Sequence, residues 1–199
     1  MKILIVTPLY PPDIAPLALY VKECATRLST KAEVTVLAYA HLPEKIDGVR
    51  IVSVAKDTPA FIRMAFFAFA LWREGRSVDV IYVQNGASVE LPVRLTSLFV
   101  STPYVLHVSD SVALESAREN SLNKKILHAA LRGAIHIIHG ARIVLPFPFR
   151  EKTTVVEVPH HRPEILPFRD YPEASFAEYE ESWNEHIEKI THTFTYAKR

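Results

Sequence analysis

The sequence predicts an α/β fold: a single Rossmann-like domain with a mostly parallel sheet, helices on both faces and a closing C-terminal helix. Residues 3–6 form an apolar run rich in β-branched residues, stopped by Pro8, which is typical of a strand buried on both faces. From Leu17 to Leu28, apolar residues recur at steps of three and four, as on one face of a helix. Strand and helix patterns then alternate along the chain, and this alternation favours a parallel sheet.

Short apolar or alternating runs predict six further strands, at residues 33–38, 49–54, 79–83, 103–108, 142–146 and 154–158. The strict alternation in the second of these runs is typical of an edge strand. Helices are predicted between the strands, at residues 61–72, at 88–100 and from about 111 through 131, the last with a break near Asn120.

A last helix is predicted after a linker rich in proline and charge. Ser175 and Glu178 form a capping box, which marks a helix start. Trp183, Ile187 and Phe194 then fall on one face of the helix. Because the preceding domain offers the available core, we expect this helix to pack back on it. The predicted organisation is therefore a domain over residues 1–161, a linker over 162–174 and a closing helix over 175–199.

The bulk composition limits the class of protein. The chain has 199 residues, of which 49% are hydrophobic, and a formal net charge of +1, which suits one domain and gives no sign of nucleic-acid binding. The single cysteine, Cys24, excludes an internal disulfide and indicates a packed thiol in a reducing, cytoplasmic compartment. The amino-terminal apolar run is too short for a signal peptide, and no segment reaches the length of a membrane span.

The usual signatures of cofactor and metal sites are missing. The loop over residues 7–16 follows the first strand, where a dinucleotide-binding fold has a glycine-rich turn, but it contains no glycine. His136 and His139 have the spacing of a metal pair on a helix, yet no third ligand is near in sequence, so we expect solvated or core histidines. We therefore predict no cofactor and no metal.

The predicted helix at residues 61–72 is apolar nearly all round. Arg63 is its one charge, and Arg73 and Arg76 follow it. One interpretation is a helix covered on two sides, by the sheet and by another element. The other is a surface that meets a membrane or a partner, with the arginines near lipid headgroups. The second interpretation places the protein peripherally at a membrane.

Five segments together resemble retaining glycosyltransferases of the GT-B fold, family 4. These are residues 3–21 (ILIVTPLYPPDI followed by LALYV), 80–86 (VIYVQNG), 103–106 (PYVL), 109–115 (SDSVALE) and 154–161. The segment at 109–115 is similar to the family's Gly-Asp-x-x-Trp-Glu motif. The resemblance covers about residues 1–161, and residues 176–198 resemble the family's final helix, which crosses back onto the first domain.

The resemblance implies two Rossmann-like domains that face each other across a cleft. In the family, the amino-terminal domain mainly holds the acceptor, and the carboxy-terminal domain binds the nucleotide-sugar. Nothing in this sequence resembles the donor-binding domain, so the chain looks like the acceptor-side domain with its crossing-back helix and without the donor domain. The family's Gly-Gly pair is replaced by Ala15 and Pro16, and its motif glycine and tryptophan by Ser109 and Leu114, which weakens the case for a working site.

The candidate site residues follow predicted strands at the carboxyl edge of the sheet. His107 and Asp110 are candidates for catalysis, as groups that polarise or deprotonate an acceptor. Asn85, Gly86, Asp110 and Glu115 are candidates for acceptor binding. Alternatives remain open for each: a buried, hydrogen-bonded imidazole for His107, a helix cap for Asp110, a solvated carboxylate for Glu115 and a turn for Asn85 and Gly86.

These observations favour the acceptor-side domain of a retaining glycosyltransferase, inactive alone, that binds a sugar, glycan or lipid-linked acceptor. Three alternatives stay open. The chain could be half of a split enzyme whose donor domain is supplied in trans. It could be a non-catalytic binding or scaffold module, at a membrane through residues 61–72. It could also self-associate as a homodimer through a face left exposed.

Overall fold

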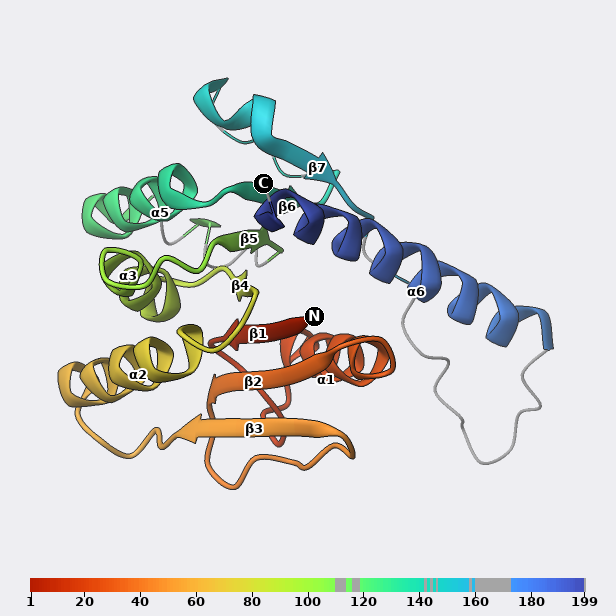
Figure 1. The fold of residues 1–199 in the computed structure, drawn as a ribbon, viewed down its shortest axis with the longest axis horizontal. Coiled ribbons are helices and arrows are strands. Elements are labelled where there is room, and N and C mark those ends of the chain that lie inside the picture. The colour runs from red at the N-terminus through yellow and green to blue at the C-terminus, as the bar shows by residue number, and fades with distance from the viewer. Residues whose placement is uncertain are drawn as a thin grey trace.

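The computed structural model describes residues 1–109, 114–115, 119–141, 143, 145, 147–157, 159 and 173–198. Its centre is one sheet of seven strands in the order β3-β2-β1-β4-β5-β6-β7, and every neighbouring pair is parallel (Figure 1). The strands are β1 (Lys2–Thr7), β2 (Glu33–Tyr39), β3 (Val49–Val54), β4 (Val80–Gln84), β5 (Tyr104–Val108), β6 (His136–His139) and β7 (Thr153–Val155).

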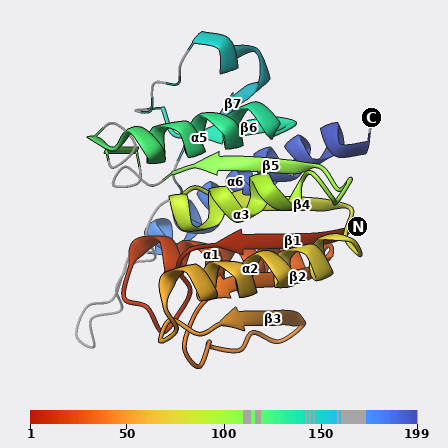
Figure 2. The same ribbon diagram turned by 90° about the vertical axis from the view of Figure 1, so that its left-hand side faces the viewer.

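Helices cover both faces of this sheet. Figure 2 shows α2, α3 and α5 in front of the strands, with α1 and α6 behind them. The helices are α1 (Pro16–Ser29), α2 (Ala60–Gly75), α3 (Ala87–Thr96), α5 (Ser121–Gly133) and α6 (Glu173–Phe194), with short 3-10 helices η1 (Phe147–Lys152) and η2 (Thr195–Lys198). The predicted fold class is confirmed.

The central strand β1 shows why the sheet is buried on both faces. Leu4 and Val6 belong to the core under α2, α3 and α5, whereas Ile3 and Ile5 belong to the core under α1 and α6. Successive side chains of a strand point to opposite faces, so a continuous apolar run fills both cores. By contrast β3 is half-exposed and lies at the end of the sheet, which confirms the predicted edge strand.

Helix α6 packs against the sheet and α1. Trp183, Ile187 and Phe194 are buried in the same core as the apolar face of α1. Arg27 of α1 forms a two-point ion pair with Glu180 of α6, with its Nη1 and Nη2 atoms at 2.9 and 2.8 Å from the carboxylate oxygens. The Arg27 guanidinium also lies 5.4 Å from the centre of the Trp183 ring. The helix at the C-terminus therefore closes one face of the domain, as predicted.

Three predicted boundaries need correction. His136 and His139 lie on strand β6, not on a helix, because residues 136–139 pair with β5 and extend the sheet. Of the strand predicted at 142–146, residues 143 and 145 are described and neither is in a strand. The strand predicted at 154–158 ends at Val155.

Two other boundaries concern helices. The predicted break near Asn120 is confirmed, since its side chain caps α5 by accepting hydrogen bonds from the backbone of Leu122 and Asn123. Helix α6 begins at Glu173, two residues before the predicted start. Residues 162–172 of the predicted linker lie outside the described residues, so the division into domain, linker and helix stays a prediction. Within the described part of the chain, no helix is both long and apolar enough to cross a bilayer.

Candidate functional site

The strand order changes direction between β1 and β4: β2 and β3 lie on one side of β1, and β4 to β7 lie on the other. The chain leaves β1 into α1 on one face and leaves β4 into α3 on the opposite face, so it turns to opposite sides of the sheet beyond the carboxyl ends of these two strands. Ligands of open α/β sheets bind at this switch point. The residues that border it are Thr7 at the end of β1 and Gln84 at the end of β4, together with the loops that follow them.

Gly86 brings the two loops into close contact. Its φ angle is +150°, a conformation that side chains disfavour. A Cβ atom built on Gly86 would lie 3.3 Å from Cγ of Pro8, so a side chain there would also press on the β1 loop. Gly86 therefore has the positive φ angle expected of it, and glycine lets the backbone after β4 approach the loop after β1.

Polar side chains link the ends of β4 and β5. The backbone N–H of Ser109 donates to Oδ1 of Asn85 at 3.0 Å, and the Ser109 hydroxyl donates to Oε1 of Gln84 at 3.1 Å. The backbone N–H of Asn85 donates in turn to the carbonyl of His107 at 3.0 Å. Gln84 and Asn85 are buried, so these hydrogen bonds fix the edge of the sheet where a ligand would rest.

Glu90 lies beneath the Gly86 turn, in the first turn of α3. Its Oε1 atom accepts a hydrogen bond from the backbone N–H of Gly86 at 3.0 Å, and the residue is buried. Burial raises the pKa of Glu90 from 4.5 to about 7, although the hydrogen bond from Gly86 opposes this shift. A carboxyl group that titrates near neutral pH at a switch point is suited to proton transfer or to binding a hydroxyl group.

His107 belongs to a buried chain of hydrogen bonds between the sheet and α6. Its Nδ1 atom lies 2.6 Å from the hydroxyl of Tyr82, which lies 3.1 Å from the hydroxyl of Tyr20. The Tyr20 hydroxyl lies 2.7 Å from Nε2 of His186, and Nδ1 of His186 lies 2.8 Å from the carbonyl of Glu157. The alternative of a buried, hydrogen-bonded imidazole is therefore what the geometry shows for His107.

The hydrogen-bond partners assign the protons of both histidines. The Glu157 carbonyl can only accept, so Nδ1 of His186 carries the proton and its Nε2 accepts from Tyr20. The Ser109 hydroxyl donates to Oε1 of Gln84, so the NH2 group of Gln84 faces Nδ1 of His107 at 3.5 Å. Because an NH2 group can only donate, Nδ1 of His107 is the acceptor. Both imidazoles are neutral: burial lowers the pKa of His107 to about 3, and burial lowers that of His186 to about 4.

The loop over residues 8–15 is held by its own polar contacts. Nζ of Lys56 lies 2.6 Å from Oδ1 of Asp13, and the Asp13 carboxylate also accepts from the backbone N–H of Tyr10. The Tyr10 hydroxyl is buried without a hydrogen-bond partner among the described residues, and burial raises its pKa to about 12. Pro16 occupies the first position of α1, so this helix start offers one N–H group fewer to an anion.

The remaining predicted site and metal-ligand residues are Glu115, Asp110, His136 and His139. Glu115 is exposed, so its carboxylate is free to meet a ligand from solvent. Asp110 lies outside the described residues. His136 donates to or accepts from Oγ1 of Thr154 at 2.8 Å, and no group of three potential metal ligands occurs in the part of the chain that the structure describes.

Sequence reasoning missed Gln84 and Glu90. The only signal for Glu90 was its position four residues after Gly86, which follows a strand. At this spacing a carboxylate can accept a hydrogen bond from the glycine N–H. The signal for Gln84 was an amide at the last position of an otherwise apolar strand.

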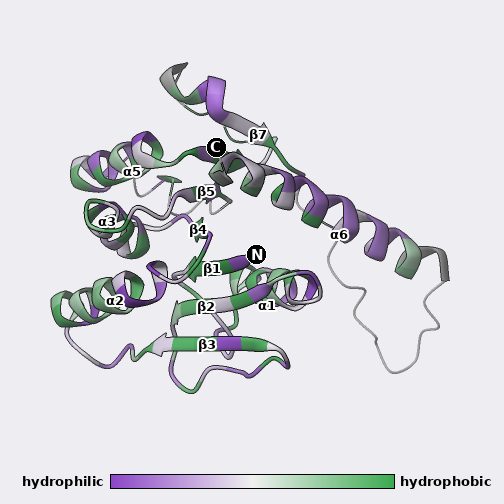
Figure 3. Cartoon of the chain, viewed as in Figure 1, coloured by the Kyte–Doolittle hydropathy of each residue, from purple (hydrophilic) through white to green (hydrophobic). Residues whose placement is uncertain are grey.

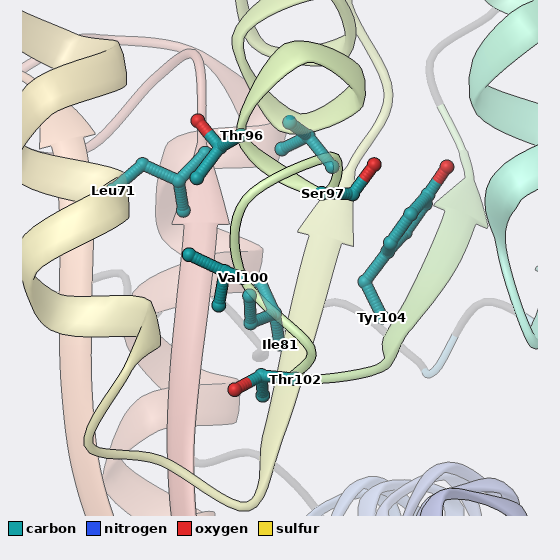
Figure 4. Close-up of a pocket in the computed structure, with 8 residues that line it drawn as sticks. Leu71, Ile81, Thr96, Ser97, Val100, Thr102 and Tyr104 are labelled. Carbon is teal, nitrogen blue, oxygen red and sulfur yellow. The ribbon is translucent and has the colours of Figure 1, made fainter.

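Two cavities lie away from the switch point. One, of about 10 Å³, lies between α2 and α3 near the amino-terminal ends of β4 and β5, where Leu71, Val100 and Tyr104 line it (Figure 4). This volume is at most that of a single water molecule, so it is a packing gap. The other, of about 530 Å³, is an open groove beside Thr154 of β7 and Lys189 of α6.

Solved structures with a similar fold are longer proteins. HepE from Anabaena, in complex with UDP-glucose, matches 91% of this chain with 17% identity and a TM-score of 0.56, over 49% of its own length. The UDP-GlcNAc 2-epimerase of Methanocaldococcus jannaschii matches 78% of this chain with 14% identity and a TM-score of 0.52, over 45% of its own length. An α-glucosyltransferase in complex with UDP and DNA matches 80% of this chain with 12% identity and a TM-score of 0.52.

These similarities establish the fold. This chain spans less than half the length of the three proteins, since it covers 49%, 45% and 41% of them. No protein-family profile matches the chain, and no curated protein matches it.

Proposed function

We propose that this chain is the acceptor-side domain of a GT-B glycosyltransferase that transfers a sugar from a nucleotide-sugar to a glycan or lipid-linked acceptor. The observation that carries the proposal is the match of 91% of the chain, including one Rossmann-like sheet, to about half of a protein bound to UDP-glucose. The sequence segments that resemble retaining enzymes of family 4 support the same function.

The structure of the β1 loop supports an acceptor-side role. A donor site needs backbone N–H groups that approach a phosphate. Here the loop over residues 8–15 has no glycine, and Pro16 removes an N–H group from the start of α1. We therefore propose that the chain alone does not turn over nucleotide-sugars, and that a donor domain, in the same protein or in trans, supplies that half of the site.

The polar groups at the carboxyl edge suit an acceptor sugar. A carboxylate group hydrogen-bonds to sugar hydroxyls, and the exposed Glu115 provides one, while the buried Asn85 and Glu90 hold the backbone N–H groups of Ser109 and Gly86 at this edge. We assign Asp110, which follows β5 in the sequence, as the candidate that contacts the acceptor oxygen. We assign His107 a positioning role, because its neutral ring is held between Tyr82 and Gln84.

A glycan array and a turnover assay test this proposal. We expect the purified chain to bind a defined set of glycans and to release no UDP from UDP-glucose. Glu115→Gln should weaken glycan binding about three- to tenfold, since it removes a charge-assisted hydrogen bond. Glu119→Gln is the matched control, because Glu119 is also exposed, and it should leave binding unchanged.

Two outcomes would overturn the proposal. Sugar transfer or UDP release by the chain alone would show that it has a donor site. A folded chain that binds no glycan would remove the acceptor-side role and favour the scaffold alternative.

A further inference from the structure

Helix α2 turns an apolar face to solvent. Phe61, Ala65, Phe69 and Trp72 recur at steps of four, four and three residues, so they lie on one side of the helix, with Phe66 beside them. Phe61, Phe66 and Phe69 are 71%, 57% and 58% exposed. We call these five residues the α2 outer face. Figure 3 shows α2 mostly in the hydrophobic colour, with hydrophilic colour at its C-terminal end.

The aromatic rings of this face form an ordered surface. The ring centres of Phe69 and Trp72 are 5.8 Å apart, and the Arg76 guanidinium lies over the Trp72 ring at 4.9 Å. The inner side of α2 packs against the sheet through Phe67 and Leu71, which are buried. The helix is therefore fixed by one side, and its other side presents large apolar groups that the fold does not need.

The charges beside the α2 outer face are positive. Arg73 and Arg76 lie next to this face, at the C-terminal end of α2, whereas Arg63 lies four residues before the buried Phe67 and packs on the Tyr39 ring; the single acidic residue of α2 is Glu74. Glu74 is buried and ion-paired with both Arg50 and Arg73, so it offers no exposed negative charge. The surface along α2 combines exposed aromatic rings with arginines, a combination suited to the boundary between lipid headgroups and acyl chains.

We propose that the α2 outer face binds the surface of an anionic lipid membrane. Charge decides between this occupant and a second copy of the chain. A symmetric dimer would place the same patch against itself, and neither helix offers an exposed acidic residue as a partner for Arg76 of the other copy. Anionic headgroups instead offer Arg76 such a partner, which strengthens binding.

The position of α2 relates this surface to the switch point. The helix follows β3, so its first turn lies at the carboxyl edge of the sheet. There the Arg63 guanidinium lies 5.4 Å from the centre of the Tyr39 ring, and the Tyr39 hydroxyl donates to the carbonyl of Ser88, two residues after Gly86. A membrane along α2 would border the candidate site. Entry of a lipid-linked acceptor from this side rests on the proposed function. Membrane binding by the α2 outer face does not depend on that function.

Vesicle flotation tests the proposal directly. The full chain is mixed with vesicles of phosphatidylcholine alone or of phosphatidylcholine with phosphatidylglycerol, at low and high salt. We expect binding to the anionic vesicles that weakens at high salt. Phe66→Ser with Phe69→Ser should reduce this binding at least about tenfold, because two exposed rings no longer enter the lipid. Arg76→Glu should reduce it about tenfold on anionic vesicles.

Matched controls separate this face from exposed apolar residues in general. Leu19→Ser with Phe176→Ser removes two exposed apolar side chains, 62% and 54% exposed, from α1 and α6 on the opposite face of the sheet. This variant should bind vesicles as the unchanged chain does, and circular dichroism should confirm that all variants are folded. Failure of the folded, unchanged chain to bind anionic vesicles would overturn the proposal. Equal loss of binding in the control variant would overturn it too, as would concentration-dependent dimers abolished by Phe66→Ser with Phe69→Ser.

Glycan binding measured on the same preparations keeps the two proposals separate. A chain that binds glycans but not vesicles retains the proposed function and loses the membrane surface. A chain that binds vesicles but not glycans loses the proposed function and retains the membrane surface.

Discussion

Helices α6 and α2 lie on opposite faces of the same sheet, and they differ in what they do with their apolar residues. Trp183 and Phe194 of α6 are buried against the sheet and α1, and polar groups of His186 and Tyr20 are satisfied at the same interface. In α2 the inner side is buried as well, but Phe66 and Phe69 remain exposed. The comparison indicates that α6 serves the stability of the domain, whereas the outer face of α2 is available for binding.

The largest expected effect would come from truncating the α6 anchor. Trp183→Ala removes a buried ring that stacks on Tyr20, and it should lower the free energy of unfolding by about 3–5 kcal/mol. Phe69→Ala, on the exposed side of α2, should change it by less than about 0.5 kcal/mol. Urea unfolding of both variants measures the difference. Equal losses of unfolding free energy in the two variants would contradict the different roles assigned to α6 and α2.

A smaller effect is expected from the hydrogen bonds under α6. His186→Ala leaves the buried Tyr20 hydroxyl without its 2.7 Å partner, and it should cost about 1–3 kcal/mol of stability. His186→Gln, which can still accept from Tyr20, should recover part of this loss. Thermal unfolding of the pair provides the measurement, and identical losses in both variants would show that packing alone matters at this position.

The pH dependence of stability sharpens the same point. The pKa of His107 is lowered to about 3 and that of His186 to about 4, so the unfolded chain takes up these protons below its histidine pKa of 6.5 while the folded chain does not. Each histidine therefore lowers stability as the pH falls from 6.5 towards 4, by up to about 1.4 kcal/mol per pH unit.

Glu90 acts in the opposite direction. Its pKa is raised to about 7 from 4.5, so the folded chain keeps a proton that the unfolded chain loses, and stability falls as the pH rises through this window. Urea midpoints between pH 4.5 and 6.5 should therefore fall more steeply with acid in Glu90→Gln than in the unchanged chain, and less steeply in His186→Gln. Parallel profiles for all three would contradict the assigned protonation states.

A smaller effect than that of His186→Ala is expected at the rim of the α1–α6 contact. Glu180→Gln weakens the two-point ion pair with Arg27, and the carboxylate is partly exposed, so the loss should be below about 1 kcal/mol. The loss should diminish further at high salt, which a urea titration at two ionic strengths can measure. A loss above that of His186→Ala would show that the rim, and not the buried network, holds α6 in place.

Much of the fold could be predicted because burial on two faces leaves a strong pattern. The run at residues 3–6 is continuous, and a parallel strand between two layers of helices needs such a run. Strand β6 escaped prediction because Ile137 and Ile138 are its only apolar residues, enclosed by His136 and His139, and so short a run has no distinct period. Its identity depends on pairing with β5, which local sequence does not encode.

The candidate site was predictable only in part. Asn85 and Gly86 were found because a glycine after a strand indicates a special turn, and Gly86 has the expected positive φ angle. The hydrogen bond between Tyr20 and His186 joins residues 166 positions apart, so it follows from the packing of α6 and from no local motif. The raised pKa of Glu90 likewise depends on burial under the sheet edge, which the chain acquires only on folding.

Amide chemical-shift mapping tests the central claim most directly. The isotope-labelled chain would be titrated with the glycan that binds most strongly on the array, and with UDP-glucose in parallel. We expect saturable shifts for the glycan at the amides of Asn85, Gly86 and Ser109, at the carboxyl ends of β4 and β5, and none for UDP-glucose. Glycan shifts confined to the groove beside Thr154 and Lys189, or saturable shifts with UDP-glucose, would contradict it.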